Sequence, residues 1–195
     1  MKKIKKQMEF IIEIDKLKSI FRQSLLADSS RHENDAEHSW HLCMLAITLE
    51  EYAEKGTDLL RCIKMLLIHD IVEIYAGDTY LYDEKGMEDK AERERNAAEK
   101  IYGILDEEQK KQFMDLWLEF EDAKTKESIF ANTLDRVQPI MLNYLTEGKM
   151  WIKNKIHKQQ VVDKGWRIFE LAHPDIAEYM MNIIDESVEK GYLLP

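Results

Sequence analysis

The sequence predicts an all-α protein, folded as a single-domain helical bundle, on the strength of two observations. Glycine (7) and proline (3) together supply only 10 of the 195 residues, so the chain has few of the commonest turn-forming residues and favours long helices. Apolar residues recur at spacings of three and four, whereas no segment shows the strict alternation of a half-buried strand. The length suits one domain, which we assign to residues 1–195.

Three helices are predicted in the first half of the chain. Their expected limits are Ile4 to Ser19, Asn34 or Asp35 to about Lys55, and Thr57 or Asp58 to Tyr75 or Ala76. The first carries an apolar stripe that is expected to pack against the rest of the protein: Ile4, Met8, Ile11, Ile12, Leu17 and Ile20. Gly56 and Gly77 close the second and third helices. Residues 22–33 lack a helical period and are predicted to form an irregular loop.

The second half is predicted to contain five further helices after a loop over residues 78–87. Their expected limits are Glu88 to Lys100, a helix capped by Asp106, Thr125 or Lys126 to about Tyr144, Lys158 to Leu171, and Pro174 to Lys190. Aspartate and threonine are good N-cap residues, and proline is favoured in a first helical turn. The four tryptophans occupy helical positions and are predicted to be packing residues: Trp40, Trp117, Trp151 and Trp166.

Charge and composition exclude several classes of function. The formal net charge of −10 would repel a polyanion, so a nucleic acid polymer is not expected as a partner. No apolar run approaches 18 residues, so no membrane span is expected. The only cysteines, Cys43 and Cys62, lie in apolar helical stretches and are expected to stay free. These features predict a cytoplasmic protein.

Polar residues inside apolar helical runs are the strongest indication of function, because burying them is costly unless they are satisfied. Four places qualify: His38, the pair His69 and Asp70, the pair Glu73 and Asp78, and Asp135. Each has an ordinary structural explanation when it is taken alone. Together, imidazoles and carboxylates from three helices form a donor set suited to one divalent ion, which Mn²⁺, Co²⁺, Fe²⁺, Zn²⁺ or Mg²⁺ would satisfy.

The order His38, His69-Asp70, Asp135 resembles that of the HD-domain metal-dependent phosphohydrolases, an all-helical superfamily. Three local strings resemble its 5′-deoxynucleotidase-like branch: ENDAEHS at 33–39, HDIVEIYAGD at 69–78 and LDR at 134–136. The resemblance covers a core of about residues 17–145, and the C-terminal helices over 150–191 are expected to pack on that core.

The resemblance implies removal of the 5′-phosphate from (deoxy)nucleoside 5′-monophosphates by a water that the ion activates. The implied metal ligands are His38, His69, Asp70 and Asp135, and the implied catalytic carboxylates are Glu73 and Asp78. A carboxylate beside the ion can take a proton from the attacking water, which we assign to Glu73, and another can protonate the leaving oxygen, which we assign to Asp78. Two alternatives remain open: an HD-type phosphohydrolase of another nucleotide or phosphomonoester, and a non-catalytic metal-binding regulatory protein.

The resemblance also implies two substrate-binding residues. Arg22 occupies the place of a substrate-contacting arginine, and a guanidinium suits a phosphate. The next residue is Gln23, where characterised bacterial members have a tryptophan that helps to exclude a 2′-hydroxyl, so this chain departs from the pattern that selects deoxyribose. A nucleotide is thus the expected small-molecule partner. A homodimer is also expected to be possible, with the apolar last helices as the candidate interface.

Overall fold

The computed structural model describes residues 2–195, so Met1, which the predicted domain includes, lies outside it. The α-helices are α1 (Lys2–Ile14), α2 (Asp35–Thr48), α3 (Leu59–Ile68), α4 (Glu73–Ala76), α5 (Glu84–Met87), α6 (Lys90–Tyr102), α7 (Glu107–Asp122), α8 (Lys126–Leu145), α9 (Lys149–Asn154), α10 (Lys158–Lys164), α11 (Trp166–Leu171) and α12 (Pro174–Glu189). Three 3₁₀ helices, η1 (Asp15–Ser19), η2 (Glu50–Tyr52) and η3 (His69–Val72), and two strands, β1 (Phe21–Leu25) and β2 (His32–Asn34), complete the described elements. The prediction of a helical bundle is confirmed, with one short two-stranded hairpin added to it.

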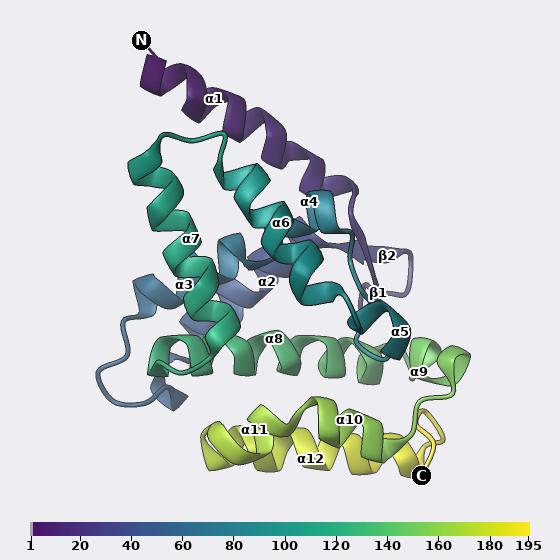
Figure 1. Ribbon diagram of the computed structural model, residues 1–195. Coiled ribbons are helices and arrows are strands. Elements are labelled where there is room, and N and C mark those ends of the chain that lie inside the picture. The colour runs from purple at the N-terminus through teal and green to yellow at the C-terminus, as the bar shows by residue number, and fades with distance from the viewer. Residues whose placement is uncertain (1) are drawn as a thin grey trace.

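Helix α8 is the central element of the molecule. In Figure 1 it crosses the middle of the view, with most of the preceding elements on one side and α10, α11 and α12 on the other. It packs against α2, α3 and α7 on the first side and against α11 and α12 on the second. A residue on α8 can therefore face either the first part of the chain or the C-terminal helices.

Several helix boundaries follow the predicted capping residues. Asn34 accepts a hydrogen bond from the backbone of Glu37 and forms a capping box at the start of α2. Asp106 and Thr125 cap α7 and α8 in the same way, and Pro174 lies in the first turn of α12. Gly77 has a φ of +77° at the end of α4, a conformation that glycine adopts without the steric cost of a Cβ.

The predicted loop over 22–33 is wrong, because its ends form a short antiparallel hairpin. Phe21 pairs with Asn34 and Leu25 with His32, and the register shifts between these two pairs. The residues of β1 do not alternate between buried and exposed positions, so the sequence carries no two-residue period that could reveal a strand. The hairpin matters for function because it fixes Arg22 and Gln23 on an ordered strand.

Three helix predictions also need correction, and one helix was missed. The second helix ends at Thr48, before η2, rather than near Lys55. The third is divided by η3, whose 3₁₀ turn changes the angular spacing of His69 and Asp70. The helix predicted over 158–171 is split at Gly165 into α10 and α11, and α9 was not predicted.

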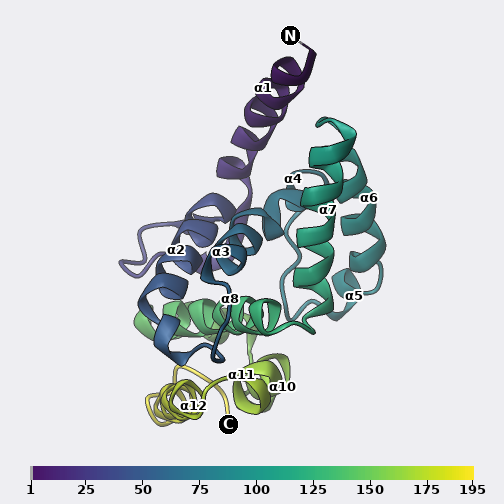
Figure 2. The same cartoon turned by 90° about the vertical axis from the view of Figure 1, so that its left-hand side faces the viewer.

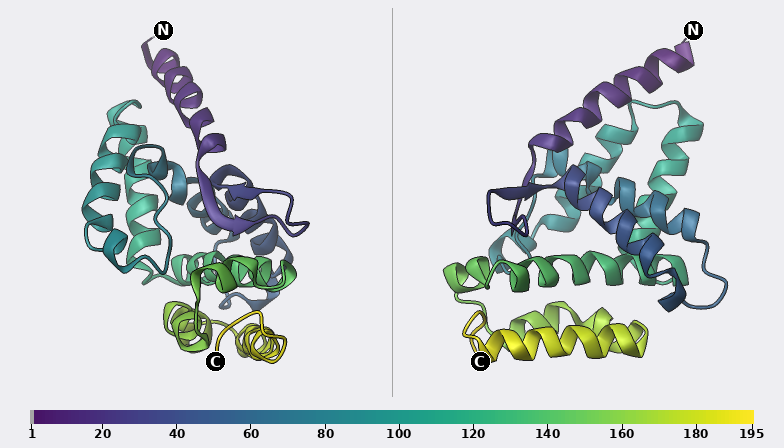
Figure 3. Two further views of the ribbon diagram at one scale, coloured as in Figure 1. Left: turned by 90° about the vertical axis from the view of Figure 1, so that its right-hand side faces the viewer. Right: turned by 180° about the vertical axis from the view of Figure 1, so that it is seen from behind.

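Two packing predictions hold only in part. Trp117 and Trp151 are buried, but Trp40 is 63% exposed and Trp166 is 41% exposed, so the latter two are not core residues. The predicted apolar stripe of the first helix is also largely exposed. The exposed fractions of its residues on α1 are 56% for Ile4, 51% for Met8, 54% for Ile11 and 68% for Ile12. Figures 2 and 3 show why, since α1 projects away from the body of the protein. None of the helices within residues 2–195 combines the length and the hydropathy that crossing a membrane requires.

Candidate metal centre and active-site pocket

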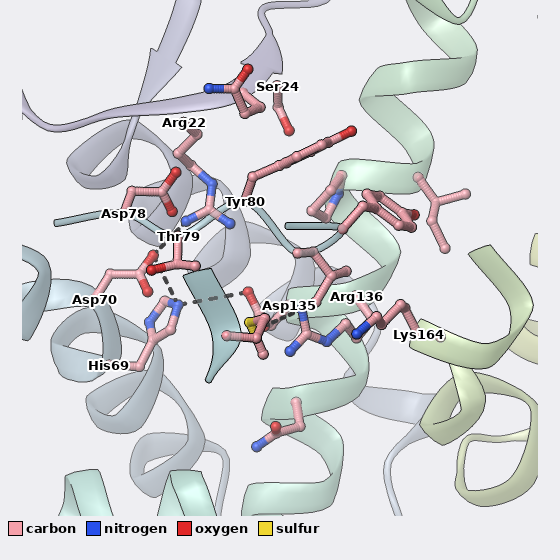
Figure 4. Close-up of a pocket in the computed structure, with 18 of the residues that line it drawn as sticks. Arg22, Ser24, His69, Asp70, Asp78, Thr79, Tyr80, Asp135, Arg136 and Lys164 are labelled. Atoms are coloured by element: carbon pink, nitrogen blue, oxygen red, sulfur yellow. Dashed lines mark hydrogen bonds and ion pairs between the residues drawn. The ribbon is translucent and has the colours of Figure 1, made fainter. Parts of the chain in front are cut away.

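The structure brings the four predicted metal ligands together from α2, η3 and α8. Donor atoms of His38, His69 and Asp135 all lie within 4.8 Å of one another, and all three residues are buried. The Oδ2 atom of Asp70 lies 3.2 Å from His69 Nε2 and 3.9 Å from His38 Nε2. Figure 4 shows His69, Asp70 and Asp135 converging on one point. The site is positioned by the shared apolar core of α2, α3 and α8.

The two imidazoles are oriented so that each presents its Nε2 atom to this point. His69 Nδ1 donates to the Leu66 carbonyl at 2.9 Å, and His38 Nδ1 donates to Gln138 Oε1 at 3.1 Å. Such bonds fix the tautomer in which Nε2 carries a free lone pair, as in many His-ligated metal sites. His69 Nε2 is buried and has no hydrogen-bond partner within residues 2–195. An orphaned imidazole nitrogen facing two carboxylates fits a divalent cation.

The charges of the site also fit a cation. Burial alone would raise the pKa of Asp70, but His69 and Arg22 lower it below its usual range. Burial opposes ionisation of Asp135 too, yet Arg136, His38 and His69 hold its pKa well below the usual value. Burial and Arg22 lower the pKa of His38 to about 4. Two ionised carboxylates and a neutral His38 are thus ready to ligate. Although burial opposes it, Asp70 and Asp135 raise the pKa of His69 well above its usual value, so His69 must release a proton when it ligates.

Arg22 reaches the metal site from strand β1. Its Nη1 atom donates to Asp70 Oδ2 at 2.7 Å and to Asp35 Oδ1 at 3.2 Å. Asp35 is fully buried, and burial together with Asp70 raises its pKa to about 8. Gln23 follows Arg22 on the strand and lines the same pocket. The structure therefore places both predicted substrate-binding residues at the pocket.

Glu73 and Asp78 approach the site from the other end of the η3–α4 segment. Glu73 is 4% exposed, and its Oε2 atom is buried without a partner in the described chain. Burial, with Asp70 and Glu94 nearby, raises the pKa of Glu73 to about 10. Asp78 follows Gly77, lines the pocket beside Glu73, and has its pKa raised by burial. Figure 4 places Asp78 on the same side of the pocket as Arg22.

Three partners of the site were missed by sequence reasoning. Gln138 is fully buried and links His38 to Glu33, to whose Oε1 it donates at 2.6 Å. Gln138 also donates to His41 Nδ1 at 3.2 Å, so His41 joins this network. Lys90 forms an ion pair with buried Glu94 and lines the pocket near Glu73. One signal was visible: Gln138 follows Asp135 by three and shares its helical face.

These residues surround a pocket of about 200 Å³. Its lining joins the metal site to the hairpin, to Tyr80 and Tyr82 after α4, and to the C-terminal helices. The fold and the site together define a class of protein: a helical bundle with a candidate metal centre of imidazoles and carboxylates beside a pocket.

Comparison with known proteins identifies the family. A family model described as "HD domain" matches residues 14–177, and the chain belongs to the HD-domain family. A curated relative, 5′-deoxynucleotidase HDDC2 of Dictyostelium discoideum, is 31% identical over 67% of this chain and 72% of its own. The protein of the same name in Danio rerio is 23% identical over 92% of this chain and 86% of its own.

Solved structures agree with this assignment. A predicted metal-dependent phosphohydrolase from Magnetospirillum magnetotacticum MS-1 is 45% identical, with a TM-score of 0.94 over 100% of both chains. A conserved hypothetical protein from Pyrococcus furiosus shares the fold at 22% identity and a TM-score of 0.62, over 93% of this chain and 99% of its own. The predicted membership of the HD-domain phosphohydrolases, and with it the prediction of a hydrolytic enzyme, is confirmed.

Proposed function

We propose that this protein hydrolyses nucleoside 5′-monophosphates, deoxynucleotides included, to a nucleoside and inorganic phosphate. The observation that carries the proposal is the convergence of His38, His69, Asp70 and Asp135. All but the fully buried His38 line a pocket that Arg22, Glu73 and Asp78 also line. The names of the curated relatives, which are 5′-deoxynucleotidases, support the choice of substrate.

In this proposal the four converging side chains hold one divalent ion. Such an ion, when bound, lowers the pKa of a coordinated water and stabilises charge on phosphoryl oxygens. Arg22 orients the phosphate through its guanidinium. Glu73 takes the proton of the attacking water. Its pKa of about 10 is that of the metal-free protein, and the charge of a bound cation would act with Lys90 to favour the carboxylate form that this role needs. Asp78, whose pKa is raised by burial, gives a proton to the leaving 5′-oxygen.

Phosphate release is the direct test of the function. The metal-stripped protein is supplied with Mn²⁺, Co²⁺ or Mg²⁺ and assayed on paired ribo- and deoxyribonucleoside 5′-monophosphates, with triphosphates and a simple phosphomonoester alongside. Metal-dependent release from the 5′-monophosphates is the expected result. Release from triphosphates alone would instead assign another HD-type reaction, and no release with any metal would overturn an enzymatic role.

Substitution of Gln23 by tryptophan is expected to raise the preference for deoxynucleotides. Gln23 lies on β1 next to Arg22 and lines the pocket. If Arg22 binds the phosphate, the indole ring of a tryptophan at this position would crowd the 2′-hydroxyl of a ribose. The measurement is the ratio of kcat/KM on a deoxynucleotide to that on its ribo counterpart, with a severalfold rise expected. An unchanged ratio would place the sugar away from β1.

We also propose a cytoplasmic location and no polymeric nucleic acid partner. Cys43 and Cys62 are both free and buried, as is usual in a reducing compartment. The net charge of −10 disfavours extended contact with a polyanion.

We further propose a homodimer, through α1 and α2 rather than through the last helices. The exposed apolar stripe of α1 projects from the body, and α2 exposes a second stripe, Trp40, Met44 and Ile47, at helical spacing. Exposed apolar stripes of this kind are typical of interfaces. A second copy is the favoured occupant because four of the first six residues are lysines, and the acidic chain offers them a complementary surface.

Substitution of Ile12 by glutamate is expected to convert the dimer to a monomer, because it places a charge at the most exposed position of the α1 stripe. Analytical ultracentrifugation measures the mass, and Ile152→Glu, at a similarly exposed isoleucine on α9, is the control that should remain dimeric. A monomeric wild-type protein would contradict the proposal.

A further inference from the structure

Three basic side chains line the pocket on the side formed by the C-terminal half of the chain. Arg136 comes from α8, Lys164 from the end of α10 and Arg167 from α11. In the view of Figure 4, Arg136 and Lys164 lie on the opposite side of His69 and Asp135 from Arg22. The pocket therefore has basic groups on two walls, with the candidate metal centre between them.

These basic groups have few carboxylate partners of their own. Within residues 2–195 neither Lys164 nor Arg167 has a carboxylate within ion-pair distance, and Arg136 has only Asp135, at 3.8 Å. The Nε atoms of Arg136 and Arg167 are buried and make no hydrogen bond in that range. By contrast, Lys158 on the same helix as Lys164 forms an ion pair with Asp185. Buried donors without acceptors indicate a missing ligand.

The arrangement persists although the charges repel one another. Burial and the neighbouring charge of Arg136 lower the pKa of Arg167, with Glu121 and Asp135 acting in the opposite direction. The Arg167 guanidinium lies 4.8 Å from the ring of Trp166, which fixes its position. Asp135 is itself a proposed metal ligand, so its charge is shared with the ion. A ligand with negative charge would satisfy all three basic side chains.

The phosphate that is hydrolysed already has its own partners. It must lie at the candidate metal centre, where Arg22 reaches Asp70 at 2.7 Å. Lys164 and Arg167 come from a separate layer of the molecule, below α8 in Figure 1. We propose that Arg136, Lys164 and Arg167 form a second anion subsite, which binds a phosphate of the nucleotide other than the one that is hydrolysed. This inference rests on the proposed function.

Two classes of nucleotide would supply that group. A nucleoside 3′,5′-bisphosphate carries its second phosphate on the sugar, and a nucleoside 5′-diphosphate carries it along the 5′ chain. Either should bind more tightly than the matching 5′-monophosphate, by about tenfold for one well-placed charged contact. If the 3′,5′-bisphosphate binds more tightly, the subsite lies near the sugar. If the 5′-diphosphate binds more tightly, the subsite lies along the 5′ chain.

Calorimetric titration tests the subsite without relying on turnover. The Mn²⁺-loaded Glu73→Gln protein, which is not expected to hydrolyse its ligand, is titrated with the 5′-monophosphate, the 3′,5′-bisphosphate, the 5′-diphosphate and inorganic pyrophosphate. Arg167→Gln and Lys164→Gln are then added separately to that background. Each should bring the affinity of the favoured two-phosphate ligand down to that of the monophosphate, and Arg167→Lys should restore part of the difference. Arg95→Gln, at an exposed arginine of α6 outside the pocket, is the matched control.

The outcomes separate the subsite from the proposed function. Equal weakening of monophosphate and two-phosphate ligands would mean that these residues bind the reacting phosphate, and it would overturn the second subsite. No effect of either substitution would overturn it as well. If no nucleotide binds at all, the proposed function is wrong, and the subsite is then judged from pyrophosphate. Pyrophosphate binding that both Arg167→Gln and Lys164→Gln weaken would support the subsite. No pyrophosphate binding, or binding that neither substitution changes, would overturn the subsite.

Discussion

Replacing Asp70 with asparagine should remove the bound metal and nearly all hydrolytic activity together. Asp70 contributes the carboxylate that lies 3.2 Å from His69 Nε2, and asparagine of similar size lacks its charge. Loss of an outer partner of a metal ligand already costs 10–100-fold in metal affinity, so loss of a ligand should cost more than about 100-fold. An ion contributes several kcal/mol to the transition state, and turnover should fall by about 10³-fold or more.

The measurements are elemental analysis of the purified protein and phosphate release with added metal. Asp115→Asn, at an exposed ion pair on α7, is the control for the loss of an acidic group elsewhere and should retain metal and activity. Because Asp70 also accepts a hydrogen bond from Arg22, thermal unfolding of the metal-free variant must be compared with that of metal-free wild type. Full activity of Asp70→Asn after metal is restored would show that the centre lies elsewhere.

The sequence predicts those site residues that stand out from their immediate neighbours in the chain. His69 and Asp70 follow an apolar run within one helical stretch, and a polar pair there is conspicuous whatever the rest of the fold does. The capping residues are likewise local, since Asn34 bonds to a backbone group only three residues away. The convergence of His38, His69-Asp70 and Asp135 was implied by the resemblance of their order to that of the HD-domain phosphohydrolases, and a helical bundle permits it because facing side chains meet in its core.

The parts that sequence misses depend on contacts between distant segments. Gln138 is an ordinary polar residue until α8 packs against α2 and brings it to His38, 100 residues away. Lys164 and Arg167 look like solvated charges in sequence, and only the packing of α10 and α11 beneath α8 brings them to the pocket. The hairpin that holds Arg22 was missed because pairing between β1 and β2, not an internal period, defines it.

Glu73→Gln is expected to keep the metal while lowering turnover by about 10²–10⁴-fold, the range that a general base contributes. Glutamine preserves the size of the side chain but cannot accept a proton from water. Elemental analysis should show a full complement of metal, which distinguishes this variant from Asp70→Asn. Glu92→Gln, at an exposed position on α6, should change neither quantity. Loss of the metal from Glu73→Gln would make Glu73 a ligand instead.

The same substitution is expected to change how the free energy of unfolding depends on pH. The pKa of Glu73 is about 10 in the folded, metal-free protein and about 4.5 in an unfolded chain, so over this interval only the folded state holds the proton. The stabilising contribution of that proton is complete below pH 4.5 and is lost as the pH rises toward 10. Glutamine mimics the protonated form at every pH. The Tm of metal-free Glu73→Gln should therefore exceed the Tm of metal-free wild type by an amount that grows from pH 6 to pH 9. If the difference between the two Tm values did not change with pH, Glu73 would already be ionised in its pocket.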